Sequence, residues 1–350
     1  MKILKYIFII AALAVVFLTV YIATGKSNYE INVSKKTELS NQRLFRYVNN
    51  LQNFGDWNPW NNDAAAFKLD SIYKGKDAKV SWNGNEAFIK KSIPNDTIFL
   101  KLNVSGNDYD TKMYFDEVDG KTTVNWHVKG NLSFSEKFKL FFQGTPDSMI
   151  APIFEEGLIK INKNITESLK KFSIKNEGIV MIPEMFYIKQ IVESDIEGLG
   201  DKIFQSMEHM NNFAKSFELE PYGSPFTVFE NINVLSGNVR YSVCLPIKNF
   251  FSTAEGSDIV CEKLPAFHGY KTVLTGDYIH SDKAWTEVKK EIATKNLTQR
   301  ADLKPISIYK TSILTTQKTS EWITEFIIPV NETVIPIIDT PATDTLSVNR

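Results

Sequence analysis

The sequence has few of the residues that most often build reactive or metal-binding sites. It contains only two cysteines and four histidines, and the histidines are scattered without the spacing of metal ligands. Two cysteines do not make the disulfide framework of a small secreted domain. Cys244 and Cys261 each lie in an apolar run, which favours buried free thiols, although pairing in a translocated domain stays open. The sequence predicts no metal and no cofactor.

An excess of charge of one sign is also missing. The formal net charge is −1, so the chain lacks the basic surface of a nucleic-acid-binding protein. No helix-turn-helix can be placed, because the N-terminal region that would hold it is apolar. Phosphate-binding loops, dinucleotide fingerprints and nucleophile elbows do not occur in the sequence. Nucleic acid is therefore not a predicted partner, and no common catalytic motif is present.

Long apolar runs are missing as well, except at residues 3–23. Only Lys5 interrupts this run, which matches the roughly 20 residues that a helix needs to cross a bilayer. Lys2, Lys5 and the amino terminus place positive charge at the start of the span. Lys26, Lys35 and Lys36 follow it, with Glu30 among them, so the charge bias modestly favours a cytoplasmic N-terminus. A cleaved signal peptide is the alternative, but its apolar core would be shorter and residues 21–25 make a poor cleavage site. We expect an uncleaved single-pass anchor with extracytoplasmic soluble domains.

The rest of the chain has an ordinary globular composition and is long enough for two domains. The first is predicted at residues 28–172. A strand at residues 29–35 precedes a short helix capped by Ser40 and a tight aromatic turn at residues 54–60. The runs that follow alternate in polarity between turn residues, which predicts an antiparallel meander. The turn pairs are Asn83-Gly84, Ser105-Gly106, Asp119-Gly120 and Gly130-Asn131.

One long helix is predicted to close this domain. Six apolar residues recur at intervals of three or four positions and form a continuous stripe. Such a stripe has to be buried, and the meander is the surface available to it. The six residues are Phe154, Leu158, Ile161, Ile165, Leu169 and Phe172.

Residues 33–60, which include the turn FGDWNPW, and residues 154–158 (FEEGL) resemble the SRPBCC family of START-like, polyketide-cyclase-like proteins. The resemblance implies a helix-grip fold, in which an antiparallel sheet wraps around a long C-terminal helix. An apolar cavity lies between the sheet and the helix. Many members bind lipids or other hydrophobic molecules there. The segment KDAKVSWNGNEAF departs from the family, because it is shorter and poorer in glycine. The alternative is a core filled by its own aromatic side chains. These are Trp82, Phe115 and Trp126.

The second domain is predicted at residues 179–332, after a polar linker at 173–178. Strand-like residues precede a helix with Ile203, Met207, Met210, Phe213 and Phe217 on one face. Further strands precede a second helix at 282–294, with Trp285, Val288 and Ile292 inward, and a last strand at 322–330. This order predicts a duplicated α+β unit. Residues 333–350 are predicted to form a loose tail.

Five segments in this order resemble the GyrI-like family, the effector-binding domain of AraC- and MerR-type regulators. They are GSPFTVFEN, VCLPI, LPAFHGYKTVLTGDY, the helix that contains Ala284-Trp285, and TEFIIPV. The resemblance spans about 150 residues and implies two halves that enclose a pocket for small, often cationic and lipophilic molecules. In that family a glutamate on the last strand reaches into the pocket among aromatic rings, and Glu325 is the matching position.

The chemistry of the last strand supports Glu325 independently. It is the only charge between Trp322 and Val330, and it shares a strand face with Ile323 and Ile327. A carboxylate in such surroundings is partnered or has a raised pKa, which makes it a site candidate. The alternative is an edge strand with Glu325 in water. Aromatic residues that could surround a cation, or simply pack, are Tyr278, Trp285 and Trp322, followed by Tyr187 and Tyr309.

The function predicted from these features is binding or sensing of a small hydrophobic or cationic organic molecule by a membrane-anchored protein, whose protein partner is unknown. The first domain would hold a hydrophobic ligand or act as a rigid spacer. One alternative is a hydrolase with Glu325 as general base, helped by Tyr278 or Tyr187. Another is a non-catalytic envelope scaffold with filled pockets and an apolar interaction patch.

Overall fold

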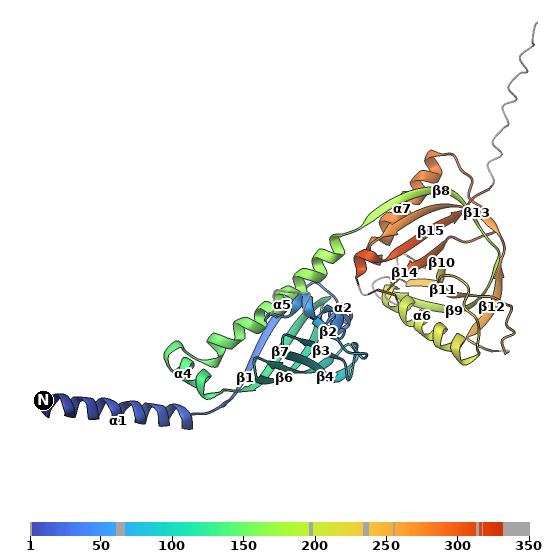
Figure 1. Cartoon of the computed structure of the whole chain (residues 1–350). Coiled ribbons are helices and arrows are strands. Elements are labelled where there is room, and N and C mark those ends of the chain that lie inside the picture. The colour runs from blue at the N-terminus through green and yellow to red at the C-terminus, as the bar shows by residue number, and fades with distance from the viewer. Residues whose placement is uncertain are drawn as a thin grey trace, which may run out of the picture. The chain divides into compact units, whose positions relative to one another are not determined.

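The structure is a computed structural model that describes residues 2–60, 67–195, 199–233, 238–254, 256–312, 315–316 and 318–331. The chain divides into two compact units, residues 1–167 (unit 1) and 168–350 (unit 2). Each unit is α+β and is built on one large antiparallel sheet (Figure 1), as predicted for the fold class. The predicted tail at 333–350 lies outside the described residues.

Unit 1 begins with the apolar helix α1 (Lys2–Thr24). Residues 3–24 have a mean hydropathy of 2.7, and the helix is long and apolar enough to cross a membrane. At 1.5 Å per residue, these residues span about 33 Å, which matches the hydrocarbon core of a bilayer. The predicted apolar helix is confirmed, and its length and composition fit a membrane anchor or a signal sequence.

The sheet of unit 1 is the predicted meander. Its strand order is β1-β7-β6-β5-β4-β3-β2. At three of the predicted turns, the residue before the glycine and the glycine itself both have positive φ, as two-residue hairpins of type I′ require. The strands are β1 (Asn28–Thr37), β2 (Phe67–Leu69), β3 (Lys79–Trp82), β4 (Asn85–Ile93), β5 (Thr97–Val104), β6 (Asn107–Val118) and β7 (Lys121–Asn131), with helices α2 (Asn41–Val48) and α3 (Phe54–Trp57) after β1.

The long helix α5 (Pro146–Lys170) packs on this sheet. Gly157 permits the close approach, because a Cβ atom there would lie 2.7 Å from the ring of Trp126. Four members of the predicted apolar stripe are buried, but the prediction for Phe172 is wrong. The helix ends at Lys170, so Phe172 lies beyond it and stacks on His280 of unit 2 at 3.7 Å between ring centroids.

One helix of unit 1 was not predicted from the sequence. Helix α4 (Phe134–Gln143) lies between the meander and α5. Its start is fixed by a capping box, in which Ser133 and Glu136 bond each other's backbone N–H groups. None of its residues is buried, so it contributes no side chain to the core of unit 1.

Unit 2 contains a curved eight-stranded sheet with the order β12-β9-β11-β10-β14-β15-β13-β8. One pairing pattern occurs twice: a strand, a helix and two further strands, with the last strand between the other two. The elements are β8 (Ser173–Ile182), β9 (Met185–Asp195), α6 (Leu199–Ser216), β10 (Phe226–Asn233), β11 (Asn238–Ile247), β12 (Ile259–Leu264), β13 (Phe267–Thr275), η3 (Tyr278–His280), α7 (Ser281–Thr294), β14 (Ile306–Thr311) and β15 (Ile323–Pro329).

The prediction of a linker at residues 173–178 is wrong, because these residues form the first part of β8. β8 is an edge strand paired only with β13 among the described strands. An edge strand leaves the backbone groups of one edge unpaired. The side chains of β8 from Ser173 to Met181 alternate between exposed and half-buried, and Ile182 at its end is buried. The polar composition therefore reflects the edge position and not a break in structure.

The curvature of the sheet follows from its connections. Six strand spacings separate β8 from β9, which would be about 29 Å in a flat sheet. However, Ile182 ends β8 and Met185 begins β9, so three chain steps of at most about 11 Å join them. The sheet therefore curves until the edge formed by β8 approaches β9, near the opposite edge (Figure 1).

The two faces of this sheet have different coverings. Helices α6 and α7 pack on one of them, here called the helix face. The opposite face is called the inner face, and its buried cluster takes residues from seven strands. These residues are Ile182, Tyr187, Phe226, Cys244, Phe267, Ile306 and Ile327.

Two further predictions concern single side chains of unit 2. Phe217 was predicted on the apolar face of the first helix, but α6 ends at Ser216 and Phe217 is 54% exposed. Cys244 is fully buried, Cys261 is partly buried, and both are free thiols. Free thiols were the preferred prediction, and it is confirmed.

Candidate ligand-binding site

Glu325 lies on the inner face, on a strand with neighbours on both sides. β15 pairs with β13 and β14, which place Val273 and Ile308 directly beside Glu325. Its side chain is only 17% exposed, and Ile327 on the same face is fully buried. Glu325 is therefore a carboxylate at the border of an apolar cluster, and the alternative of an edge strand is wrong for β15.

Lys271 pairs with the Glu325 carboxylate and also with the carboxylate of Glu177. Its Nζ atom lies 3.4 Å from Glu325 Oε1 and 2.7 Å from Glu177 Oε2. Burial lowers the pKa of Lys271, but the hydrogen bond to Glu177 and the charge of Glu325 outweigh it, so the net shift is upward. The same hydrogen bond lowers the pKa of Glu177. Two carboxylates thus share one half-buried ammonium, with Lys175 at 3.8 Å from Glu177 and well exposed to water.

A second polar group lies farther along the inner face. Tyr187 donates a hydrogen bond of 2.8 Å to Glu262, and Lys189 pairs with the same carboxylate at 2.6 Å. Burial and the hydrogen bond to Glu262 raise the pKa of Tyr187. Burial likewise raises the pKa of the Cys244 thiol, which feels the charges of Lys189 and Glu262. The raised pKa values keep Tyr187 and the Cys244 thiol protonated near neutral pH, so Cys244 is not a reactive thiolate.

Glu230 adds a further carboxylate to this polar group. It accepts a hydrogen bond of 3.3 Å from Ser242, and it lies at a register shift in the pairing of β10 with β11. Neither Glu230 nor Glu262 was predicted as a site residue from the sequence. Their role depends on strand register, because Glu262 lies beside Tyr187 only once β12 pairs with β9.

The predicted aromatic residues gather on the helix face, away from Glu325. Tyr278 stacks on Trp322 at 4.6 Å and meets Tyr309 edge-on at 5.4 Å between ring centroids. Trp285 of α7 packs edge-on against Phe326 at 4.9 Å. Because Phe326 and Glu325 are consecutive on β15, their side chains point to opposite faces. Of the predicted aromatic set, only Tyr187 shares the face of Glu325.

The predicted site is therefore divided by the sheet. Glu325 cannot form a general-base pair with Tyr278, which lies on the other face, and Tyr187 is already bonded to Glu262. The residues that can act together on the inner face are Glu325, Lys271 and Glu177, with the polar group of Tyr187 and Glu262 farther along. No set of three His, Cys, Asp or Glu side chains suited to a metal ion occurs among the described residues.

The interior of unit 1 contains large aromatic rings where a cavity was considered. Trp126 lies 4.8 Å from Phe154 and 5.7 Å from Trp57 between ring centroids, and all three residues are fully buried. The indole N–H groups of Trp57, Trp82 and Trp126 are buried without an acceptor in the part of the chain that the structure describes. These contacts favour a filled interior next to α5.

An open depression of about 490 Å³ lies elsewhere on unit 1, along strands β3 to β6. Its lining is mostly polar, and its charged residues already have partners. Asp108 accepts a hydrogen bond of 2.8 Å from Asn103 and pairs with Lys101, while Glu86 pairs with Lys79. This depression offers no unpartnered charge to a ligand among its described residues.

Replacing Glu262 by glutamine is expected to make the free energy of unfolding of unit 2 depend less on pH in the acid range. Partial burial raises the pKa of Glu262, but hydrogen bonds from Lys189 and Tyr187 outweigh it and the net shift is downward. The stabilisation is therefore complete above the ordinary glutamate pKa of about 4.3 and is lost as the pH falls through the lower folded value. Urea midpoints between pH 7 and pH 3 test this, with Glu208→Gln on α6 as the matched control. Parallel curves for Glu262→Gln and the unmodified chain would contradict it.

Comparisons with known proteins give partial matches to solved structures. No protein-family model and no curated protein matches the chain. The C-terminal domain of EcmrR is 18% identical over 46% of this chain and 99% of that domain, with a TM-score of 0.38. SAV2435, solved with tetraphenylphosphonium bound, is 12% identical over 45% of this chain and 94% of its own, with a TM-score of 0.34. CalU16 from Micromonospora echinospora is 8% identical over 39% of this chain and 79% of its own, with a TM-score of 0.27.

Proposed function

We propose that the chain is a membrane-anchored binding protein whose second unit holds a small organic cation against the inner face near Glu325. The observation that carries this proposal is the arrangement of Glu325, Lys271 and Glu177, in which two carboxylates share one half-buried ammonium. Lys271 is closer to Glu177, so Glu325 keeps capacity for another cation. A carboxylate that is little exposed and incompletely neutralised attracts a positive charge strongly.

The surroundings of Glu325 select for a cation with apolar groups. Its neighbours Val273 and Ile308 are apolar, and the buried cluster with Ile327, Phe226 and Tyr187 begins beside them. Small-molecule sites combine such apolar lining with a few placed polar groups. A lipophilic cation gains from both features, whereas an inorganic cation gains from the charge alone.

Both family resemblances support this proposal. The repeated pairing of β9, β11 and β10 and of β13, β15 and β14 supports a duplicated, GyrI-like unit 2. The packing of α5 on a seven-stranded antiparallel sheet supports a helix-grip, SRPBCC-like unit 1. Because aromatic rings fill its interior beside α5, unit 1 serves as a rigid spacer between membrane and binding unit. Lys2 and Lys5, in the first turn of α1, support a cytoplasmic N-terminus and extracytoplasmic units.

Replacing Glu325 by glutamine is expected to weaken binding of tetraphenylphosphonium by about five- to tenfold. Removing one carboxylate near the bound cation costs about 1 kcal/mol or more of Coulomb energy near a protein surface. The measurement is isothermal titration calorimetry on the full chain in detergent. Triphenylphosphine oxide, which carries similar rings without a net charge, should lose less than about twofold, because its contacts are apolar.

Glu208→Gln is the matched control, since it removes the same charge from the exposed surface of α6. Equal loss in Glu208→Gln and Glu325→Gln would show a general field effect and contradict a site at Glu325. Absence of cation binding by the unmodified chain would favour the scaffold alternative. Turnover that disappears in Glu325→Gln while binding persists would favour the hydrolase.

A further inference from the structure

Helix α4 presents an apolar stripe that the described part of unit 1 leaves largely exposed. Four phenylalanines occupy positions that fall on one side of a helix, and each is between 46% and 64% exposed. The polar residues Glu136, Lys139 and Gln143 lie on the other side. An exposed stripe of four aromatic rings is unfavourable in water and marks a contact surface. The four residues are Phe134, Phe138, Phe141 and Phe142.

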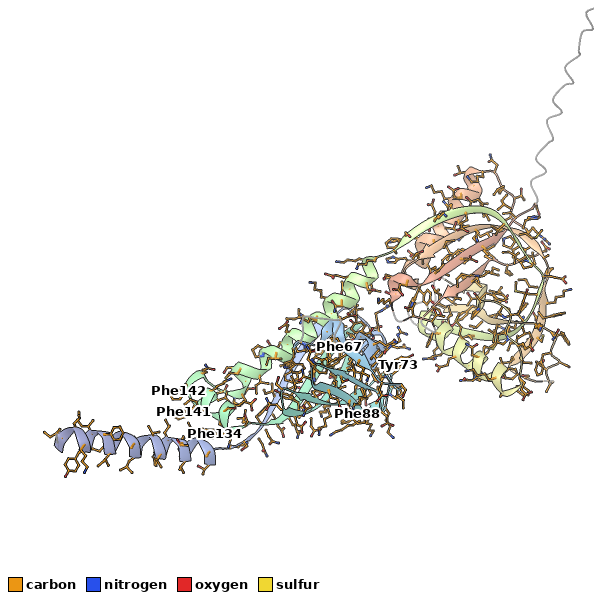
Figure 2. The ribbon with its side chains drawn as sticks, in the orientation of Figure 1. Phe67, Tyr73, Phe88, Phe134, Phe141 and Phe142 are labelled. Atoms are coloured by element: carbon orange, nitrogen blue, oxygen red, sulfur yellow. The ribbon has the colours of Figure 1, made fainter. Side chains whose placement is uncertain are left out.

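This helix is held at the end of the apolar helix α1. Lys137 Nζ donates hydrogen bonds of 3.1 Å and 2.6 Å to the carbonyl oxygens of Ala23 and Gly25. Tyr21 and Phe141 meet edge-on at 6.2 Å between ring centroids. Phe134, Phe141 and Phe142 lie on the side of unit 1 where α4 meets α1 (Figure 2). The aromatic stripe therefore begins where the apolar span ends.

The level of that junction relative to a bilayer follows from the length of α1. A span of about 33 Å that enters the hydrocarbon core at Ile3 leaves it near Tyr21 and Thr24. Tyrosine is enriched at this headgroup level, and helices with aromatic residues on one side and charged residues on the other lie along it. Helix α4 has both the composition and the position of such an interfacial helix.

We propose that α4 lies in the interface of the membrane that α1 spans, with its four phenylalanines turned to the lipid. The occupant of the stripe is thus the lipid surface itself. This inference rests on the proposed anchoring by α1. The hydrogen bond of 2.9 Å from Asn107 to Glu136 ties α4 to β6, so the interfacial helix holds the sheet of unit 1 at the membrane surface. Unit 1 is then fixed at two points, α1 and α4, and does not swing on residues 25–27.

The test measures the depth of single fluorescent labels on the full chain in lipid vesicles. Single cysteines, introduced in a Cys261→Ser background that keeps the buried Cys244, carry an NBD label. The vesicles contain phosphatidylcholine and phosphatidylglycerol, with nitroxide-labelled lipids as quenchers. Phe142→Cys reports on the stripe and Leu13→Cys on the span. Val118→Cys is the matched control, since Val118 is equally exposed but lies about ten strand residues, or about 33 Å, from the α1 end of β7.

The expected result is strong quenching, at least about twofold, for labels at positions 13 and 142, and little quenching at position 118. A label at Gln143, on the polar side of α4, should be quenched less than one at Phe142. Quenching at 13 with none at 142 would overturn the interfacial helix and leave the anchor intact. No quenching at 13 would overturn the anchor and this inference together. A label at 142 that neither lipid nitroxides nor aqueous iodide reach would show a protein contact and overturn the inference.

Discussion

Replacing Trp126 by alanine is expected to lower the free energy of unfolding of unit 1 by about 3–5 kcal/mol. Trp126 is fully buried between Phe154 and Trp57, and the helix backbone at Gly157 approaches its ring closely. Glycine at that position and a rigid sheet below it limit any collapse around the missing ring. The variant therefore loses the transfer free energy of the indole. It also loses the van der Waals contacts of the ring, because a cavity remains in its place.

Hydrogen exchange of β7 and α5 in the full chain measures this loss locally, without unfolding unit 2. Trp285→Ala, the same substitution in unit 2, should leave exchange in β7 unchanged. Trp126→Phe keeps a ring and removes an indole N–H that has no described acceptor, so we expect it to cost much less. Benzene or indole should restore part of the protection of Trp126→Ala by filling its cavity.

The same experiment decides what unit 1 does. If Trp126→Ala costs less than about 1 kcal/mol, the interior is already hollow, and a hydrophobic ligand held there becomes the better account. The N–H groups of Trp57 and Trp82, which have no acceptor among the described residues, would then point to a ligand with acceptor oxygens. A large loss keeps unit 1 as a spacer and places the binding function on unit 2.

Local chemistry made the hairpins and the long helix of unit 1 predictable. Asn83-Gly84 and Asp119-Gly120 need positive φ at both positions, and few structures other than tight hairpins provide it. The stripe from Phe154 to Ile165 has helical spacing and a core to cover. By contrast, α4 was missed although Ser133 and Glu136 form a capping box, since its phenylalanines cover no part of the core.

The candidate site was only half predictable for a related reason. Alternation along β15 correctly separates Glu325 from Trp322, because neighbouring strand residues point to opposite faces. Which face Tyr278 and Trp285 occupy depends on where α7 packs, and a strand pattern carries no information about that. The partners Lys271 and Glu177 of Glu325 could not be predicted from the sequence either. The three residues come together only because β13 pairs with both β8 and β15.

Replacing Lys271 by methionine is expected to tighten binding of tetraphenylphosphonium by about tenfold and to destabilise unit 2 by about 2 kcal/mol. The substitution leaves Glu177 and Glu325 without their shared cation, so a bound cationic ligand takes the place of the lost ammonium. Loss of one partner of a buried pair costs about 3–5 kcal/mol, and partial exposure of these carboxylates reduces that cost. The ligand should recover part of the lost stability.

Calorimetry and urea unfolding of the full chain, with and without the phosphonium ion, measure both effects. Lys248→Met is the matched control, because Lys248 pairs with Glu220 at the exposed surface of unit 2. Together with Glu325→Gln, the experiment fixes the sign of the ligand's charge. A cation site requires weaker binding in Glu325→Gln and tighter binding in Lys271→Met. If an anionic probe such as benzoate shows the reverse order, Lys271 is the binding group and Glu325 is its counter-ion, so the site would take a carboxylate in place of a cation.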